Sequence, residues 1–223
     1  MNYTSIIFDL DGVLCKTDEY HYLAWEKVTK ERKFYFDRKI NNQLRGVSRL
    51  DCVDIILSQN QNEYTQEEKM MMASEKNEMY VEFLNNMSAN DLCEGANEIL
   101  QHLKNFHYKI AIASASKNAK HALRQLQIFD MFDVIVDGND VSKTKPDPEI
   151  YLTTLLRLKE KNHNALVIED ATVGLKASRS AGIDVVAYGY NCDKTYADYH
   201  IEKLTELFGI LATDCSERRV SRQ

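Results

Sequence analysis

The chain has 223 residues, of which 44% are hydrophobic and 28% charged, and its formal net charge is −6. This is the composition of an ordinary globular protein, and the acidic balance argues against the basic surface on which nucleic-acid binding depends. No apolar run approaches the roughly 18 residues of a membrane span, and we see no charged leader followed by a long apolar stretch.

The first predicted strand, Ser5–Phe8, is followed by a long stretch that carries only helical patterns. These patterns lie at Glu19–Arg32, Arg49–Gln59 and Thr65–Asn86. Because the stretch is too long to be a connecting loop, it predicts an inserted helical domain, residues 16–90, which we call the cap. Residues 1–15 and 91–223 would then form the core domain.

Helices and strands alternate after the cap. The order is helix Ala96–Phe106, strand Lys109–Ser114, helix Ala119–Phe129, strand Val134–Val136, helix Pro148–Leu158, strand Ala165–Glu169, helix Val173–Gly182 and strand Asp184–Tyr188. Near-continuous apolar strands are typical of a parallel sheet buried on both faces, and Gly182 is the expected carboxyl-terminal cap of its helix. The pattern predicts an α/β fold with a doubly wound, parallel, five-stranded sheet.

Chemically active side chains follow four of the predicted strands. They are Asp9 and Asp11 after the first, Ser114 and Ala115 after the second, Lys145 after the third, and Glu169 and Asp170 at the end of the fourth. Carboxylates gathered at one sheet edge repel one another unless a hard cation such as Mg²⁺ lies between them. A carboxylate can attack phosphorus when a metal and a lysine neutralise the transferring group, and a second carboxylate can move the proton. The set therefore predicts a phosphoryl-transfer site.

Four motifs carry these residues, in the order "DLDGVL", "SAS", "TKPDP" and "IEDATVG". On them the chain resembles the haloacid dehalogenase superfamily of phosphotransferases, in which a helical cap follows the first motif. The resemblance implies a Rossmann-like core, with Asp9 as the nucleophile that forms an aspartyl-phosphate and Asp11 as the general acid and base. It also implies that Mg²⁺ is held by the Asp9 carboxylate, the Asp11 backbone carbonyl and Asp170 with Glu169 beside it, and the phosphate by Ser114, the Ala115 amide and Lys145.

Segments of the cap and core narrow the substrate. "TDEYHYLAW" (17–25), "LRGVSR" (44–49), "EKN" (75–77) and "SASKN" (114–118) resemble the sugar phosphomutases of that superfamily, which interconvert β-glucose 1-phosphate and glucose 6-phosphate through β-glucose 1,6-bisphosphate. Such an enzyme needs a second anion site for the far phosphate, and Arg49 offers a planar fork. The implied substrate-binding residues are His21, Trp25, Arg45, Gly46, Val47, Ser48, Arg49, Lys76, Ser116, Lys117 and Asn118. The implied hinges are Thr17 and Ser88–Asn90.

Other interpretations remain open for the roles of single residues and for the function of the protein. Arg49 can be a solvated helix start, Lys76 a lysine on a polar helix face and Trp25 part of the cap's apolar core. A sugar-phosphate phosphatase of the same superfamily is the alternative function, since it shares the first four motifs. A phosphate-binding module without activity is disfavoured, because nucleophile, base, lysine and metal carboxylates are all present.

Several smaller expectations complete the prediction. Position 45 is arginine where the family leads us to expect lysine, and the return from cap to core, Cys93-Glu94-Gly95, lacks an expected proline. We expect a cis peptide bond between Lys145 and Pro146. Five cysteines without CxxC spacing predict neither a disulfide framework nor a zinc site, and favour a cytoplasmic protein. We further expect a monomer that binds a small sugar phosphate, and a frayed basic tail, "ERRVSRQ".

Overall fold

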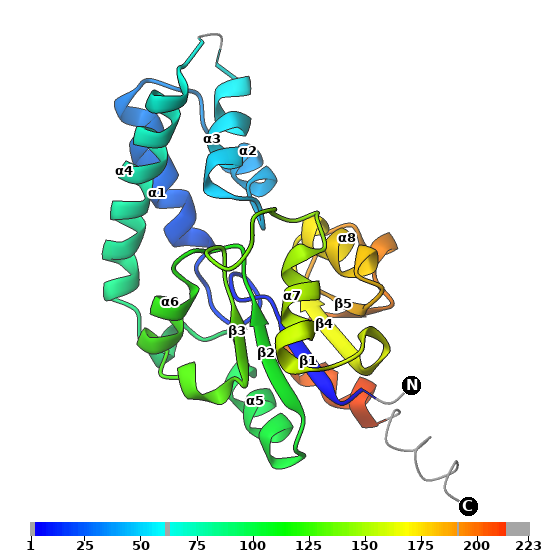
Figure 1. The fold of residues 1–223 in the computed structure, drawn as a ribbon. Helices are drawn as coiled ribbons and strands as arrows, with labels where there is room; N and C mark the ends of the chain where they lie inside the picture. The colour runs from blue at the N-terminus through cyan, green and yellow to red at the C-terminus, as the bar shows by residue number, and fades with distance from the viewer. Residues whose placement is uncertain (1–2, 61–62, 191, 213–223) are drawn as a thin grey trace, which may run out of the picture.

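The computed structural model describes residues 3–60, 63–190 and 192–212. These residues form a six-stranded parallel sheet in the order β3-β2-β1-β4-β5-β6, covered by helices (Figure 1). The strands are β1 (Ser5–Phe8), β2 (Lys109–Ala113), β3 (Val134–Val136), β4 (Ala165–Glu169), β5 (Asp184–Tyr188) and β6 (Tyr199–Ile201). The predicted fold class is confirmed, but the count of five strands is wrong by one. The missing strand, β6, reads "YHI" and has no apolar run that would mark it.

The central strand β1 sets the geometry of the site. All four of its residues are buried, and it pairs with β2 on one side and β4 on the other. Phe8 lies opposite Ile112 in β2 and Ile168 in β4. The ladder continues one residue further, because the Asp9 amide donates to the Ile168 carbonyl at 3.0 Å. The carboxyl ends of the three strands therefore lie side by side, and the polar residues that follow them come close together.

Two apolar clusters flank the sheet, as the alternation of side chains along a strand requires. In β1, Ile6 and Phe8 belong to one cluster and Ile7 to the other. The helices of the core are α5 (Ala96–Asn105), α6 (Ala119–Gln125), α7 (Glu149–Leu158) and α8 (Thr172–Ser180). Gly182, just past α8, has φ +70°, as expected for a glycine that ends a helix.

The cap stands over the carboxyl ends of the strands (Figure 1). It contains α1 (Asp18–Glu31), α2 (Arg38–Gln43), α3 (Arg49–Ser58) and α4 (Gln66–Asn85). The sequence pattern did not reveal α2, which has only six residues. Its N-cap is Asp37, whose side chain accepts from the Ile40 amide at 2.8 Å. The cap has an apolar cluster of its own, which includes Trp25 and Val53.

Two segments join cap and core, and they run side by side. Cys15 pairs with Leu92 in an antiparallel bridge, and the Lys16 amide donates to the Asp91 carbonyl at 3.1 Å. This pairing is why we propose domain boundaries at 15/16 and 90/91. No described helix is long and apolar enough to cross a membrane, and the basic segment 217–223 lies outside the described residues.

Candidate active site

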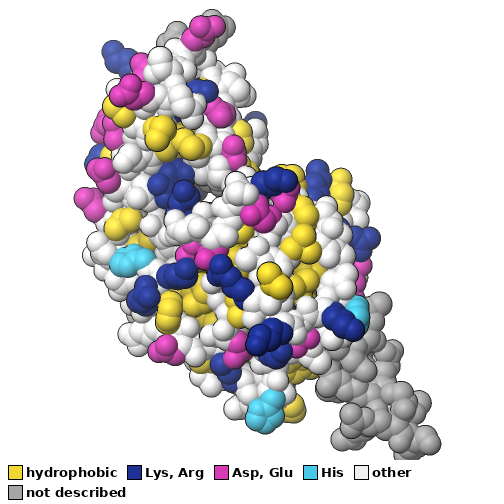
Figure 2. All heavy atoms as spheres, viewed as in Figure 1, with side chains coloured by type: hydrophobic (Ala, Val, Ile, Leu, Met, Phe, Trp, Pro, Cys, Tyr) yellow, Lys and Arg dark blue, Asp and Glu magenta, His cyan; other side chains and the backbone are white. Residues whose placement is uncertain are grey.

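A cavity of about 470 Å³ lies between cap and core, where the space-filling view shows a hollow edged by basic and acidic side chains (Figure 2). All eleven residues predicted to bind substrate line it, together with Asp9, Asp11, Ala115 and Lys145. The other predicted residues are buried near its floor and do not line it: Thr17, Ser114, Glu169 and Asp170. The structure thus brings residues from four strand ends and three cap helices to one site.

The predicted nucleophile, Asp9, is buried and ion-paired. Lys145 Nζ donates to Asp9 Oδ1 at 2.7 Å and to the Ala113 carbonyl at 3.2 Å, and it also contacts Glu169 Oε1. The Lys145–Pro146 peptide bond is cis, as predicted. Tyr151 of α7, which no sequence motif singles out, donates to Glu169 Oε1 at 2.8 Å. One ammonium group is therefore shared by two carboxylates.

The charge at this position is not balanced by protein groups alone. Burial raises the pKa of Asp9, although the Lys145 ammonium lowers it, and burial also raises the pKa of Asp170. Burial opposes the charged form of Lys145 too, but the carboxylates of Asp9 and Glu169 raise its pKa well above the usual value, so the amine stays protonated. Lys145 contacts Asp9 and Glu169, and Arg45 of the cap contacts Asp170, so two protein cations face three carboxylates. The excess negative charge favours a further cation.

The carboxylates of Asp9, Glu169 and Asp170 form a group that could hold a metal ion. Ligand atoms of Asp9, Glu169 and Asp170 lie within 4.8 Å of one another, and all three residues are buried. An all-oxygen donor set of this kind suits Mg²⁺. Two glycines leave room for these carboxylates: a Cβ at Gly12 would meet Asp170 Oδ2 at 2.3 Å, and one at Gly174 would meet Glu169 Oε1 at 1.9 Å. The expected fourth ligand, the Asp11 backbone carbonyl, stays a prediction.

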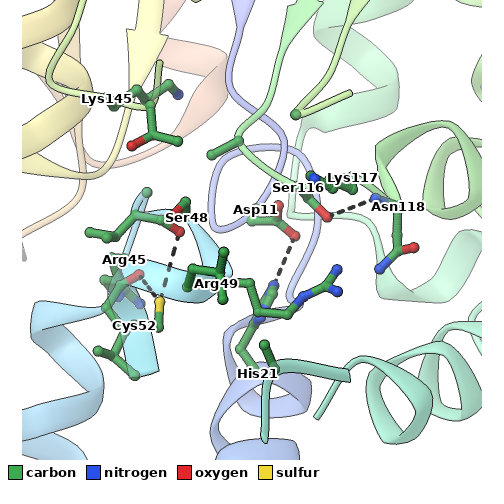
Figure 3. A pocket seen from close by; sticks show the side chains of 18 of the residues that line it. Asp11, His21, Arg45, Ser48, Arg49, Cys52, Ser116, Lys117, Asn118 and Lys145 are labelled. Atoms are coloured by element: carbon green, nitrogen blue, oxygen red, sulfur yellow. Dashed lines mark hydrogen bonds and ion pairs between the residues drawn. The ribbon is translucent and has the colours of Figure 1, made fainter. Parts of the chain in front are cut away.

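Asp11 is held as an ionised carboxylate. Its Oδ1 accepts from Thr17 Oγ1 at 2.5 Å and Tyr80 OH at 3.2 Å, and lies 3.6 Å from His21 Nε2 (Figure 3). Burial raises its pKa, but the interactions with His21, Thr17 and Tyr80 outweigh burial and hold the pKa at about 2. The side chain is therefore available as a proton acceptor.

Lys76 of the cap contacts two of the residues that surround Asp11. Lys76 Nζ lies 2.7 Å from His21 Nδ1, and 4.4 and 5.4 Å from the ring centres of Tyr80 and Trp25. Burial lowers the pKa of Lys76 to about 7. Trp25 both belongs to the cap's apolar cluster and lines the cavity, so its two sequence readings are compatible.

Arg49 is placed to receive an anion. Its side chain extends from the cap toward Asn118 and away from Lys145 (Figure 3), and it forms no salt bridge with any described residue. Across the cavity the Asn118 amide donates to Ser116 Oγ at 3.2 Å. Asn118 Nδ2 donates to Asn77 Oδ1 of α4 at 2.8 Å, which ties core to cap. Burial lowers the pKa of Arg49, as expected for a guanidinium that has no acidic partner among the residues described.

Arg45 makes a contact between the cap and the three grouped carboxylates that was not predicted from the sequence. Its Nη1 donates to Asp170 Oδ2 at 2.9 Å, and its Nη2 contacts Asp18 Oδ2. Asp18 reads in the sequence as an acid in the first turn of a helix, and Tyr80 as an ordinary buried residue. Both lack a local motif, because their partners lie far away along the chain.

Comparison with known proteins gives consistent matches over nearly the whole chain. A sequence profile of the haloacid dehalogenase-like hydrolase family matches residues 6–188. The chain is 38% identical to the β-phosphoglucomutase of Bacillus subtilis over 91% of each sequence. It is 31% identical to a phosphorylated carbohydrates phosphatase of Thermotoga maritima, over 83% of this chain and 84% of that one. The crystal structure of β-phosphoglucomutase from Clostridium difficile matches with a TM-score of 0.89 and 35% identity, over 98% of this chain and 99% of that one.

Proposed function

Because the chain belongs to the haloacid dehalogenase-like hydrolase family, we propose that it is a β-phosphoglucomutase, which interconverts β-glucose 1-phosphate and glucose 6-phosphate. The observation that carries this proposal is the guanidinium of Arg49 inside the cavity, which forms no salt bridge within the described part of the chain. A phosphatase needs only the phosphate site at Asp9. An enzyme that handles a sugar with a phosphate at both ends needs a second anion site, and Arg49 supplies one.

Asp9 acts as the nucleophile. In the phosphorylated enzyme it donates its phosphoryl group to the 6-hydroxyl of β-glucose 1-phosphate, and the ionised Asp11 takes the hydroxyl proton. The resulting β-glucose 1,6-bisphosphate reorients between the two anion sites. Its 1-phosphate then returns to Asp9, Asp11 gives back the proton, and glucose 6-phosphate is released.

Two sets of groups hold the phosphates. Lys145, Ser114 and the Ala115 amide bind the group being transferred, and Arg49, Ser116, Lys117 and Asn118 bind the other one. Mg²⁺, held by Asp9, Glu169 and Asp170, would supply the additional positive charge that lets one anion approach another. Lys145 keeps Asp9 oriented throughout, because its ammonium is fixed by three acceptors.

Exclusion of water separates a mutase from a phosphatase, since water competes with the sugar for the phosphoryl group. Several side-chain contacts hold the cap on the core here, among them Arg45 with Asp170, Asn77 with Asn118, Asn85 with His121 at 2.9 Å, and Asp51 with Thr144 at 3.1 Å. Opening must occur for substrate to enter, and the hinges at Thr17 and Ser88–Asn90 stay predictions.

A sugar-phosphate phosphatase is the second candidate, favoured by the similarity to the phosphatase of T. maritima. The two are separated by incubating the full chain with Mg²⁺, β-glucose 1-phosphate and a trace of β-glucose 1,6-bisphosphate. Phosphorus NMR resolves the two possible products. We expect glucose 6-phosphate to accumulate with little inorganic phosphate, and predominant inorganic phosphate would overturn the proposal.

Matched variants sharpen this assay. Asp9→Asn is expected to abolish both products, because the amide cannot attack phosphorus. Arg49→Met is expected to reduce formation of glucose 6-phosphate by on the order of 100-fold or more, as for loss of a hydrogen-bonded ionic contact. Arg38→Met removes an exposed arginine of the cap, which pairs with Glu19, and should leave the rate unchanged. Monomeric state and cytoplasmic location stay predictions.

A further inference from the structure

Arg45 links the cap to the proposed metal site through a carboxylate that the metal needs. Its guanidinium lies between Asp18 of the cap and Asp170 of the core, and its side chain is only 17% exposed. Asp170 is one of the three carboxylates grouped within 4.8 Å, and Arg45 Nη1 bonds its Oδ2 at 2.9 Å. A guanidinium and a divalent cation beside one carboxylate repel each other and draw on the same lone pairs.

The turn that carries Arg45 lies close to the core. The next residue, Gly46, has φ +70°, and a Cβ there would meet Val173 Cγ2 at 2.8 Å and the Ala171 Cβ at 3.3 Å. The turn that carries Arg45 is therefore seated on the segment directly after Asp170. The bond from Arg45 to Asp170 therefore adds a side-chain contact at a place where the backbone of the cap already lies close to the core.

Asp18 holds the guanidinium at this place from the other side. It opens α1 directly after Thr17, which donates to Asp11. Arg45 Nε is buried and has no hydrogen-bond partner among the described residues. The two terminal nitrogens of the guanidinium are thus held by Asp18 on one side and by Asp170 on the other, while Arg45 also lines the cavity.

We propose that Arg45 is a latch that competes with the metal for Asp170. Without metal, the guanidinium neutralises Asp170 and ties the cap to the core. When a divalent cation takes the Asp170 carboxylate, Arg45 keeps Asp18 and gives up Asp170, which loosens the cap at this turn. Metal binding and cap position are thereby coupled, and each weakens the other. This inference rests on the metal site of the proposed function.

The first test is a calorimetric titration of Mg²⁺ into the full chain without any substrate. Arg45→Met removes the competitor and keeps much of the side-chain length, so its affinity for Mg²⁺ should rise by on the order of 10-fold. Arg45→Lys keeps the charge but loses the fork that spans two carboxylates, so its affinity should lie between the other two. Arg38→Met removes a cap arginine whose pair is exposed, and its affinity should equal that of the wild type.

The second test measures how firmly the cap is held at residues 44–48, and its readout does not depend on the charge of the variant. Hydrogen exchange followed by mass spectrometry reports the backbone of residues 44–48 with and without Mg²⁺. We expect Mg²⁺ to speed exchange there in the wild type and to change nothing in Arg45→Met, where the latch is already absent. Slower or unchanged exchange in the wild type on adding Mg²⁺ would overturn the proposal, as would equal Mg²⁺ affinity in the wild type and Arg45→Met.

The Mg²⁺ titration and the product assay test the latch and the mutase function independently. If the Mg²⁺ titration fails to distinguish the variants while glucose 6-phosphate still forms, the latch is wrong and the mutase stands. If inorganic phosphate is the product while the variants differ as expected, the mutase is wrong and the latch stands. Because Arg45→Lys retains the cation, it keeps the test available if Arg45→Met does not fold.

Discussion

Lys76 is an amine that the fold keeps away from water. Burial and Arg49 lower its pKa, Cys52 and Asp11 raise it, and His21 lies 2.7 Å away. The result is a pKa of about 7, against the ordinary 10.5 of the unfolded chain. Between these two pH values the unfolded state binds the proton and the folded state does not, so stability rises with pH.

The unfolding free energy should therefore rise measurably with pH. Relative to Lys76→Met, the wild type should gain up to about 1.4 kcal/mol of unfolding free energy for each pH unit between pH 7 and pH 9. Urea unfolding at three pH values measures the difference. Lys27→Met, at an exposed position of the same cap, is the control. Parallel pH profiles for the wild type and Lys76→Met would show that the amine is not desolvated.

Gly174 is the residue on which the position of Glu169 depends. A Cβ at this site would lie 1.9 Å from Glu169 Oε1, inside the carboxylate. Gly174→Ala should therefore displace Glu169 from Lys145, lower the unfolding free energy by about 1–3 kcal/mol and weaken Mg²⁺ binding. Gly209→Ala is the matched control, since nothing lies within 4 Å of a Cβ there. Equal stability of the two variants would contradict the packing argument.

Sequence reasoning singled out residues that follow strands, and it missed residues on helices that contact them. Asp9, Lys145 and Glu169 could be found because each stands at a strand end or in the loop after one. Tyr151, Tyr80 and Asp18 hydrogen-bond or ion-pair with site residues, but each reads locally as a residue of an amphipathic helix. Their contacts arise from tertiary packing, which no short motif encodes.

At the scale of elements, length and apolar content decided what the sequence could predict. Four strands were predicted at the residues where they occur, and β2 with an end one residue too late, because buried parallel strands carry uninterrupted apolar runs. The short helix α2 and the edge strand β6 are too brief to show a period. Their existence depends on the cap cluster that buries Ile40 and on the pairing of β6 with β5.

The helix α4 carries its own start signal, and this can be tested. Thr65 accepts from the Glu68 amide at 3.3 Å, and Glu68 accepts from the Thr65 amide at 2.7 Å, which is a complete capping box. Thr65→Ala should lower the unfolding free energy by about 0.5–2 kcal/mol. Ser74→Ala, in the interior of the same helix, should not destabilise, because alanine is the better helix former. Chemical denaturation of both variants decides the comparison.

At the scale of the whole molecule, the cap is expected to decide where the phosphoryl group goes. Asn77→Ala removes the hydrogen bond that joins α4 to Asn118 in the core. The cap should then close less fully and admit water, so the ratio of inorganic phosphate to glucose 6-phosphate should rise several-fold. Asn86→Ala, at an exposed site at the end of α4, is the control. An unchanged ratio, measured by phosphorus NMR, would mean that this bond does not contribute to closure.

The central place of β1 in the sheet has a consequence for biosynthesis. β1 pairs with β2 and β4, whose last residue, Glu169, is translated long after Phe8. At roughly 5–20 residues per second, the ribosome takes on the order of 10–30 s to make that second neighbour. During this time the cap can fold on the nascent chain, while the apolar strand β1 still lacks its neighbour β4. Chaperone binding to the emerging polypeptide is therefore expected at "SIIF", and to end once β4 has left the exit tunnel.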